Sequence, residues 1–121
     1  MNSLYSKQPS QRQLAVASSM QKIVSNALVT KDIYSPNLDD IIFSIPFVKI
    51  TADLKIATIY VNCFEKEKIK FILEELHALS AAIKKLIASK LKLRYIPEIR
   101  FAEDNITEKQ DNLLKIMDQL S

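Results

Sequence analysis

The chain contains no glycine in its 121 residues. Glycine is the residue that allows a positive φ at no steric cost and lets a phosphate group approach the main chain closely. Loops that hold phosphates through their backbone, such as the P-loop and the dinucleotide-binding fingerprint, depend on it. A glycine-rich phosphate cradle is therefore excluded for this chain.

The size and composition indicate one globular domain. Hydrophobic residues make up 48% of the chain and charged residues 26%, which is ordinary for a folded protein. Cys63 is the single cysteine, so no internal disulfide can form and a reducing compartment fits. The polar start of the chain does not resemble a secretory signal, and no apolar run approaches the roughly 20 residues that span a bilayer. We expect a soluble cytoplasmic monomer with a flexible arm at residues 1–9 and one domain at residues 10–121.

Positive charge is concentrated in two blocks of the sequence. Residues 1–31 carry four bases and no acid, and residues 81–100 carry six bases against Glu98 alone. Residues 32–80 and the segment after 103 have an excess of acids. Clustered cations are typical of a surface that binds phosphates, whereas the net charge of +3 alone says little.

An amphipathic helix is predicted from Ser10 to about Thr30. A serine at the N-cap accepts a hydrogen bond from an amide of the first turn. The apolar residues recur at the spacing of one helical face. They are Val16, Ala17, Met20, Ile23, Val24, Ala27 and Leu28.

Two strands are predicted after a turn at residues 34–40. Residues 41–51 are rich in β-branched and aromatic side chains, but Pro46 lacks an amide donor and therefore requires an edge strand or a bulge. Residues 52–55 would connect the hairpin. Residues 56–63 are nearly all apolar, which favours the centre of the sheet.

The pattern at residues 65–91 is helical but long for one helix in a small domain. A serine can bond to backbone carbonyls of its own helix, so we expect a break or kink at residues 79–81, around Ser80. A third strand is predicted at residues 96–102, where a proline again favours an edge.

The last element predicted is a helix at residues 106–120, opened by a capping pattern at Thr107 and Gln110. The second and third strands are joined through helices, so they can lie parallel by a right-handed crossover. The predicted fold class is α+β, with a three-stranded mixed sheet whose central strand is residues 56–63.

Two longer stretches resemble the ribosome-binding factor A family, which has a type II KH-like domain. Residues 48–61, VKITADLKIATIYV, resemble the family's hairpin, and residues 91–101, LKLRYIPEIRF, resemble its Leu-Arg-x-x-Pro-Glu-Leu-x-Phe segment. Ser10-Gln-Arg12 and Ser35-Pro-Asn-Leu38 match shorter motifs. The family usually has Ala-x-Gly at its helix kink, where this chain has Leu79-Ser80-Ala81.

The resemblance implies a ribosome assembly factor and no enzyme. Such proteins bind the immature small (30S) subunit through 16S ribosomal RNA, assist maturation of its 5′ end region, and are associated with growth in the cold. It implies no cofactor, no metal and no membrane partner, and a GTPase that releases the factor is a further candidate partner.

The candidate RNA-binding residues lie mainly in the second basic block. Lys84, Lys85 and Lys92 are expected on one helix face, together with the small residues Ala88 and Ser89. A solvated helix face is the simpler interpretation of such a charge run. The full candidate set is Arg12, Lys22, Ser80, Lys84, Lys85, Lys90, Lys92 and Arg94.

Other polar residues have simple structural interpretations. Glu74 and His77 have a spacing usable for a metal but lack further ligands. Cys63 is expected to be buried, and Asp53 to cap its own turn. Six aromatic residues are expected to be mostly in the core, without a paired platform for stacking bases: Phe43, Phe47, Tyr60, Phe64, Phe71 and Phe101. The alternative function is a protein-interaction module of the same fold that adds a partner strand at an open sheet edge and does not contact RNA.

Overall fold

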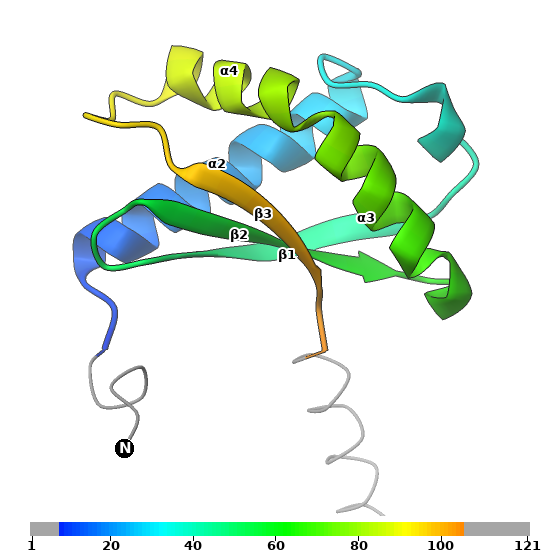
Figure 1. Cartoon of the computed structure of the whole chain (residues 1–121), viewed down its shortest axis with the longest axis horizontal. Helices are drawn as coiled ribbons and strands as arrows, with labels where there is room; N and C mark the ends of the chain where they lie inside the picture. Colours follow the sequence, from blue (N-terminus) through cyan, green and yellow to red (C-terminus); the bar gives the residue numbers. More distant parts are fainter. Residues whose placement is uncertain (1–7, 106–121) are drawn as a thin grey trace, which may run out of the picture.

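The computed structural model describes residues 8–105, which form three α-helices on one side of a three-stranded sheet (Figure 1). The predicted helix at 106–120 and most of the predicted N-terminal arm lie outside the described residues. The elements in order are α2 (Gln11–Thr30), the 3-10 turn η1 (Pro36–Leu38), β1 (Phe43–Ile50), β2 (Ile56–Cys63), the 3-10 turn η2 (Lys66–Lys68), α3 (Ile69–Ala78), α4 (Ser80–Lys90) and β3 (Glu98–Glu103).

The sheet has the predicted topology. β1 and β2 form an antiparallel hairpin, β2 and β3 run parallel, and β2 is the central strand. The α+β fold class and the order of the elements up to β3 are therefore confirmed. The third strand begins at Glu98 and not at Ile96, because Pro97 has no amide to donate and the first bond comes from the Glu98 amide to the carbonyl of Lys55, just before β2.

Pro46 lies on an edge strand and within an irregularity of that strand. The pairing of β1 with β2 shifts by one residue between Ser44 and Phe47. A bulge of this kind accommodates a residue without an amide donor and turns the side chains that follow it to the opposite face. Both parts of the prediction for Pro46 are thus confirmed.

Two glutamines of α2 bond to the outer edge of β1. Gln13 Nε2 donates to the carbonyl of Ile50 at 3.1 Å, and Gln21 Nε2 donates to the carbonyl of Ile45 at 2.7 Å. An open edge strand presents unpaired backbone groups that can recruit another chain. These two bonds satisfy carbonyls on that edge from within the molecule.

The ends of α2 show how a chain without glycine makes its turns. Ser10 and Gln13 form a capping box at the start of the helix, which confirms the predicted N-cap. The helix ends at Lys31, whose φ of 66° is left-handed, a position that glycine usually occupies. Leu54 in the hairpin connection has a φ of 61°. Each of these non-glycine residues costs about 1–2 kcal/mol of backbone strain.

The long helical segment is broken where predicted. Leu79, with φ −91° and ψ 5°, is the one non-helical residue between α3 and α4. The segment begins with η2, so the first α-helical residue is Ile69 and not Glu65. At the other end Leu91 is extended, and α4 stops at Lys90.

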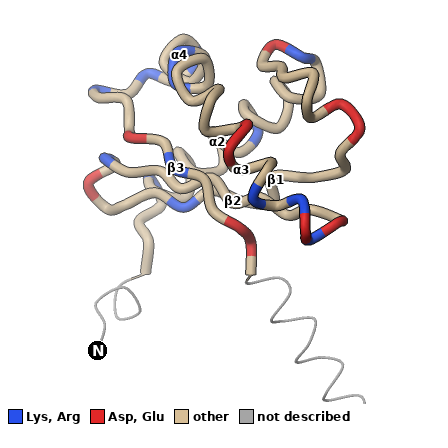
Figure 2. Tube along the Cα trace, turned by 45° about the vertical axis from the view of Figure 1, so that its right-hand side comes forward, with Lys and Arg blue, Asp and Glu red and all other residues tan. Residues whose placement is uncertain are grey.

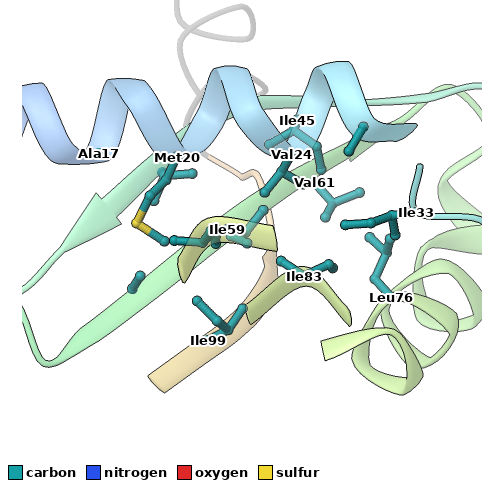
Figure 3. Packing of buried hydrophobic residues seen from close by; sticks show 14 of the residues in the cluster. Ala17, Met20, Val24, Ile33, Ile45, Ile59, Val61, Leu76, Ile83 and Ile99 are labelled. Carbon is teal, nitrogen blue, oxygen red and sulfur yellow. The ribbon is translucent and has the colours of Figure 1, made fainter. Parts of the chain in front are cut away.

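The core lies between the three helices and the inner face of the sheet (Figure 3). Ile59 and Val61 of the central strand are fully buried, as are Met20 of α2, Leu76 of α3 and Ile83 of α4. The other face of the sheet has no described helix against it (Figure 1). Among residues 8–105 the sheet therefore has one face covered by helices and one face without a helix, which we call the open face.

Candidate nucleic-acid interface

The outer face of α4 carries two of the predicted lysines. Ile83 and Ile87 are fully buried against the core, so Lys84 and Lys85 point away from it and are exposed. Ala88 and Ser89 share this exposed face. The Ser89 hydroxyl donates to the carbonyl of Leu86 at 2.7 Å, so its proton is already used within the helix.

The prediction that Lys92 shares the helix face is wrong. α4 ends at Lys90, and Leu91 takes an extended conformation that starts the loop leading to β3. Lys92 is exposed on that loop. It therefore extends the charge beyond the end of the helix instead of adding to the row on its face.

Two cations distant in sequence come together between α2 and α4. Lys22 and Lys90 line the same open cleft of about 410 Å³, with Asn26, Leu86 and Asp32. Asp32 is the one acid in this lining. Arg12 lies outside the cleft, because ten residues of α2 put it about 15 Å from Lys22 along the helix axis.

The remaining basic residue of the loop, Arg94, lies beside an exposed aromatic ring. Its guanidinium carbon is 5.5 Å from the ring centroid of Tyr95, within the range of a cation–π interaction. Figure 2 shows the blue segments of α4 and of the loop after it at the same end of the molecule.

We call this set of exposed cations the helix surface, comprising Lys22, Lys84, Lys85, Lys90, Lys92 and Arg94. None of them forms an ion pair within residues 8–105; the three ion pairs found there are Lys31–Asp39, Lys68–Glu65 and Arg100–Glu98. Unpaired cations remain available to a polyanion, because no internal bond has to be broken first. The helix surface is thus an electrostatic site without a deep pocket.

Ser80 is placed differently from the lysines. It is the first residue of α4, and its Oγ is shielded from solvent with no hydrogen-bond partner within residues 8–105. The predicted bond from the Ser80 hydroxyl to a backbone carbonyl is therefore not formed within these residues, and Ser80 does not add an exposed polar group to the helix surface.

Two simple structural interpretations are confirmed. Cys63 is buried and its Sγ donates to the carbonyl of Glu65 at 3.0 Å. Asp53 Oδ1 accepts from the Thr51 hydroxyl at 2.6 Å and from the Lys55 amide at 3.0 Å, and these bonds lower the pKa of the Asp53 carboxyl. Residues 8–105 bring no three potential metal ligands together, and no helix among them is both long and apolar enough to cross a membrane.

The expectation that the aromatic residues lie mostly in the core is confirmed for Phe43 and Phe101, which pack against it, and is wrong for the other four. Phe64 is 80% exposed and Phe71 is 42% exposed. Phe47 and Tyr60 are half-buried on the open face of the sheet, where their rings stack with centroids 4.6 Å apart. A paired aromatic platform is therefore present after all, because the bulge at Pro46 turns Phe47 outward.

A family model for ribosome-binding factor A matches residues 12–117 of the chain. The chain belongs to the ribosome-binding factor A family. This match covers most of the sequence, including both longer motifs and residues 106–117 beyond the described part.

Relatives in this family come from several bacteria. The chain is 35% identical over 97 residues to ribosome-binding factor A of Methylocella silvestris, a match that covers 80% of this chain and 63% of that one, just under two thirds of its length. It is 30% identical over 111 residues to that of Ruegeria pomeroyi, covering 92% of this chain and 85% of the relative.

Solved structures share the fold. A Thermotoga maritima protein proposed to be a ribosome binding factor A has a TM-score of 0.67 and 29% identity, covering 80% of this chain and 91% of that chain. Ribosome-binding factor A of Thermus thermophilus has a TM-score of 0.63 at 15% identity over 75% and 94% of the two chains. A coordinate set for the Thermus thermophilus factor, fitted into a map of a 30S complex, has a TM-score of 0.56 at 17% identity and covers 73% and 90%.

Proposed function

We propose that this protein binds the immature small ribosomal subunit through 16S ribosomal RNA and assists maturation of the 5′ end region of that RNA. The observation that carries the proposal is the helix surface, whose exposed cations have no acidic partner within residues 8–105. The Thermus thermophilus relative fitted into a 30S complex supports the choice of partner.

The chemistry of the helix surface favours recognition of RNA by shape and charge. Lysine is a flexible point charge that neutralises a phosphate without reading a base. The short side chains of Ala81 and Ala88 leave room for a sugar-phosphate backbone to approach α4 between the lysines. Lys22 and Lys90 would contact the same strand from opposite sides of their cleft. The surface would therefore bind a helix or junction of the RNA with little sequence preference.

Addition of a partner strand, which is the mechanism of the alternative function, has less support at β1. Pro46 interrupts the donors of that strand, and Gln13 and Gln21 already occupy the carbonyls of Ile50 and Ile45. A partner strand would have to displace both side chains before it could pair.

The test is charge reversal on the helix surface. The double variant Lys84→Glu/Lys85→Glu should bind small-subunit RNA with lower affinity and a shallower salt dependence, by roughly 0.7–0.9 in the logarithmic slope for each phosphate that the protein no longer neutralises. Cosedimentation with immature small subunits and a salt titration measure both effects. Adding Lys92→Glu should weaken association further.

The matched control is Lys55→Glu/Lys70→Glu, which makes the same change in net charge at exposed lysines away from the helix surface. This control should cosediment nearly as well as the wild type. Equal loss in both double variants would mean that only net charge matters, and no loss in either would show that the helix surface does not bind the RNA.

A further inference from the structure

The open face of the sheet carries a row of aromatic side chains beside a row of cations. Strand pairing places Phe47 opposite Tyr60, and Tyr60 opposite Ala102. One step along the strands it places Lys49 opposite Thr58, and Thr58 opposite Arg100. Neighbouring strands lie about 4.8 Å apart, so each row crosses the whole sheet in about 10 Å. We call these six residues the sheet surface.

The aromatic row is suited to stacking. The rings of Phe47 and Tyr60 are parallel to within 22° and 4.6 Å apart, so the pair presents a fixed slab that projects from the sheet. Ala102 is the next residue in the row and has too small a side chain to cover the ring of Tyr60 on that side. A planar group can therefore lie against Tyr60 over Ala102.

The cation row supplies charge at the same place. Lys49 Nζ is 5.9 Å from the centroids of both rings, which is close enough for a weak cation–π contact and leaves the ammonium exposed. Arg100 is exposed on the far strand and forms an ion pair with Glu98 on the same face, a bond that a phosphate would replace. Lys66 reaches the open face as well, since its Nζ is 3.5 Å from Oδ1 of Asn62. Cations thus flank the aromatic pair on two sides.

From this arrangement we propose that the sheet surface binds single-stranded RNA, with an unpaired base stacked on the Phe47–Tyr60 pair and its phosphates held by Lys49 and Arg100. Sequence-tolerant binding of single strands combines these two elements, aromatic side chains for bases and cations along the backbone. The site is separate from the helix surface and does not depend on that surface contacting RNA.

The test uses the full-length chain and fluorescein-labelled decauridylate, with an abasic strand of equal length as the base-free probe. The wild type should bind decauridylate more tightly than the abasic strand. Tyr60→Leu should weaken binding of decauridylate roughly 5-fold to 100-fold, the range for loss of one stacked base, and should leave binding of the abasic strand unchanged. Tyr60→Phe, which keeps a stacking ring, should retain the affinity.

Three further variants separate stacking on this pair from the loss of a ring elsewhere and from charge. Phe47→Leu should reproduce the loss seen with Tyr60→Leu, while Phe71→Leu, which removes an exposed ring elsewhere, should have no effect. Lys84→Glu/Lys85→Glu should leave the preference for decauridylate over the abasic strand intact. This result separates the proposal for the sheet surface from the proposal for the helix surface, because each can be wrong without the other.

Three results would overturn the proposal. One is equal affinity of the wild type for the two probes. Another is unchanged decauridylate binding in Tyr60→Leu and Phe47→Leu. The last is concentration-dependent self-association of the wild type, measured by analytical ultracentrifugation and abolished by Tyr60→Leu, since the open face would then bind a second copy of the chain.

Discussion

The helix surface and the sheet surface contact solvent from opposite sides of one small core, and they are held in place in different ways. The lysines of α4 and its loop are long, exposed and unpaired, so their charges tolerate small changes in the backbone beneath them. The rings of Phe47 and Tyr60 are fixed by strand register, so a shift of one residue in β1 would separate them. Binding through the lysines would therefore tolerate a local change in the backbone. Stacking on the two rings would not, because it depends on the position of the bulge in β1.

The largest effect is expected from Ile83→Ala, which removes a fully buried side chain beneath the lysines of α4. Such a deletion costs about 2–5 kcal/mol in the free energy of unfolding, and urea denaturation followed by circular dichroism measures it. If the two surfaces rest on one cooperative core, amide exchange should rise equally in α4 and in β2.

Exchange that rises in α4 alone would contradict this expectation and would show that α4 opens independently of the sheet. Lys85→Ala, on the exposed side of the same helix, is the control and should change the free energy of unfolding by less than about 0.5 kcal/mol.

The contrast between the two surfaces also explains what the sequence could predict. The helix surface could be predicted from the clustering of basic residues and from the helical period. The end of α4 at Lys90 changes this prediction only for Lys92, which lies on the following loop and not on the helix. The pairing of Lys22 with Lys90 across a cleft required the packing of α2 on α4, which no local pattern contains. The motifs at residues 48–61 and 91–101 predicted the family from the sequence, and the family model confirms it.

The sheet surface was missed for a specific reason. Alternation from Ile45, which is buried, would put Phe47 in the core as well, and the register of Ser44 would place Phe47 opposite Ile59. The bulge at Pro46 shifts the pairing by one residue and turns Phe47 outward. The proline signalled a bulge or an edge, but the sequence does not say which residues the shift would bring together.

A smaller effect is expected from Gln21→Leu. Gln21 bonds to Ile45 in the strand that carries Phe47 and Lys49, so it links α2 to the sheet surface. The variant removes this bond and a second one from Gln21 Nε2 to Ser25 Oγ, so it should lower the free energy of unfolding by about 1–2 kcal/mol, at roughly 0.5–1.5 kcal/mol for each bond. Urea denaturation measures the change. Gln11→Leu, at an exposed glutamine of the same helix, should have little effect; an equal loss there would point to helix propensity instead.

The smallest effect on stability is expected where η1 contacts α3. This contact lies on neither surface, so changing it should leave RNA binding by both surfaces unaltered. Glu75 of α3 accepts hydrogen bonds from Ser35 Oγ at 2.8 Å and from Asn37 Nδ2 at 3.0 Å, and these bonds lower the pKa of the Glu75 carboxyl from its ordinary value of 4.5. A lowered folded-state pKa adds stability above the unfolded pKa, and this stability is lost as the pH falls through the folded pKa.

The variant Glu75→Gln should therefore be less stable than the wild type near neutral pH, and the difference should shrink below about pH 4.5. Thermal unfolding across that pH range measures it. Ser35→Ala removes one of the two donors to Glu75. In that background, the stability difference between Glu75 and Glu75→Gln at neutral pH should be smaller. A stability difference that does not change with pH would mean that η1 does not hold the Glu75 carboxylate. As a control, the affinity of either surface for RNA should be the same in these variants as in the wild type.

The glutamine bonds between α2 and β1 also act as an alignment device. Gln13 and Gln21 are two turns of helix apart and meet carbonyls five residues apart on a strand that runs the other way. Sliding the helix by one residue would break both bonds at once, so only one alignment satisfies them. Lys22 follows Gln21 directly, and the same alignment therefore fixes where along β1 the charge of Lys22 lies. A neutral pair of amides thus sets the position of one cation of the helix surface relative to the sheet.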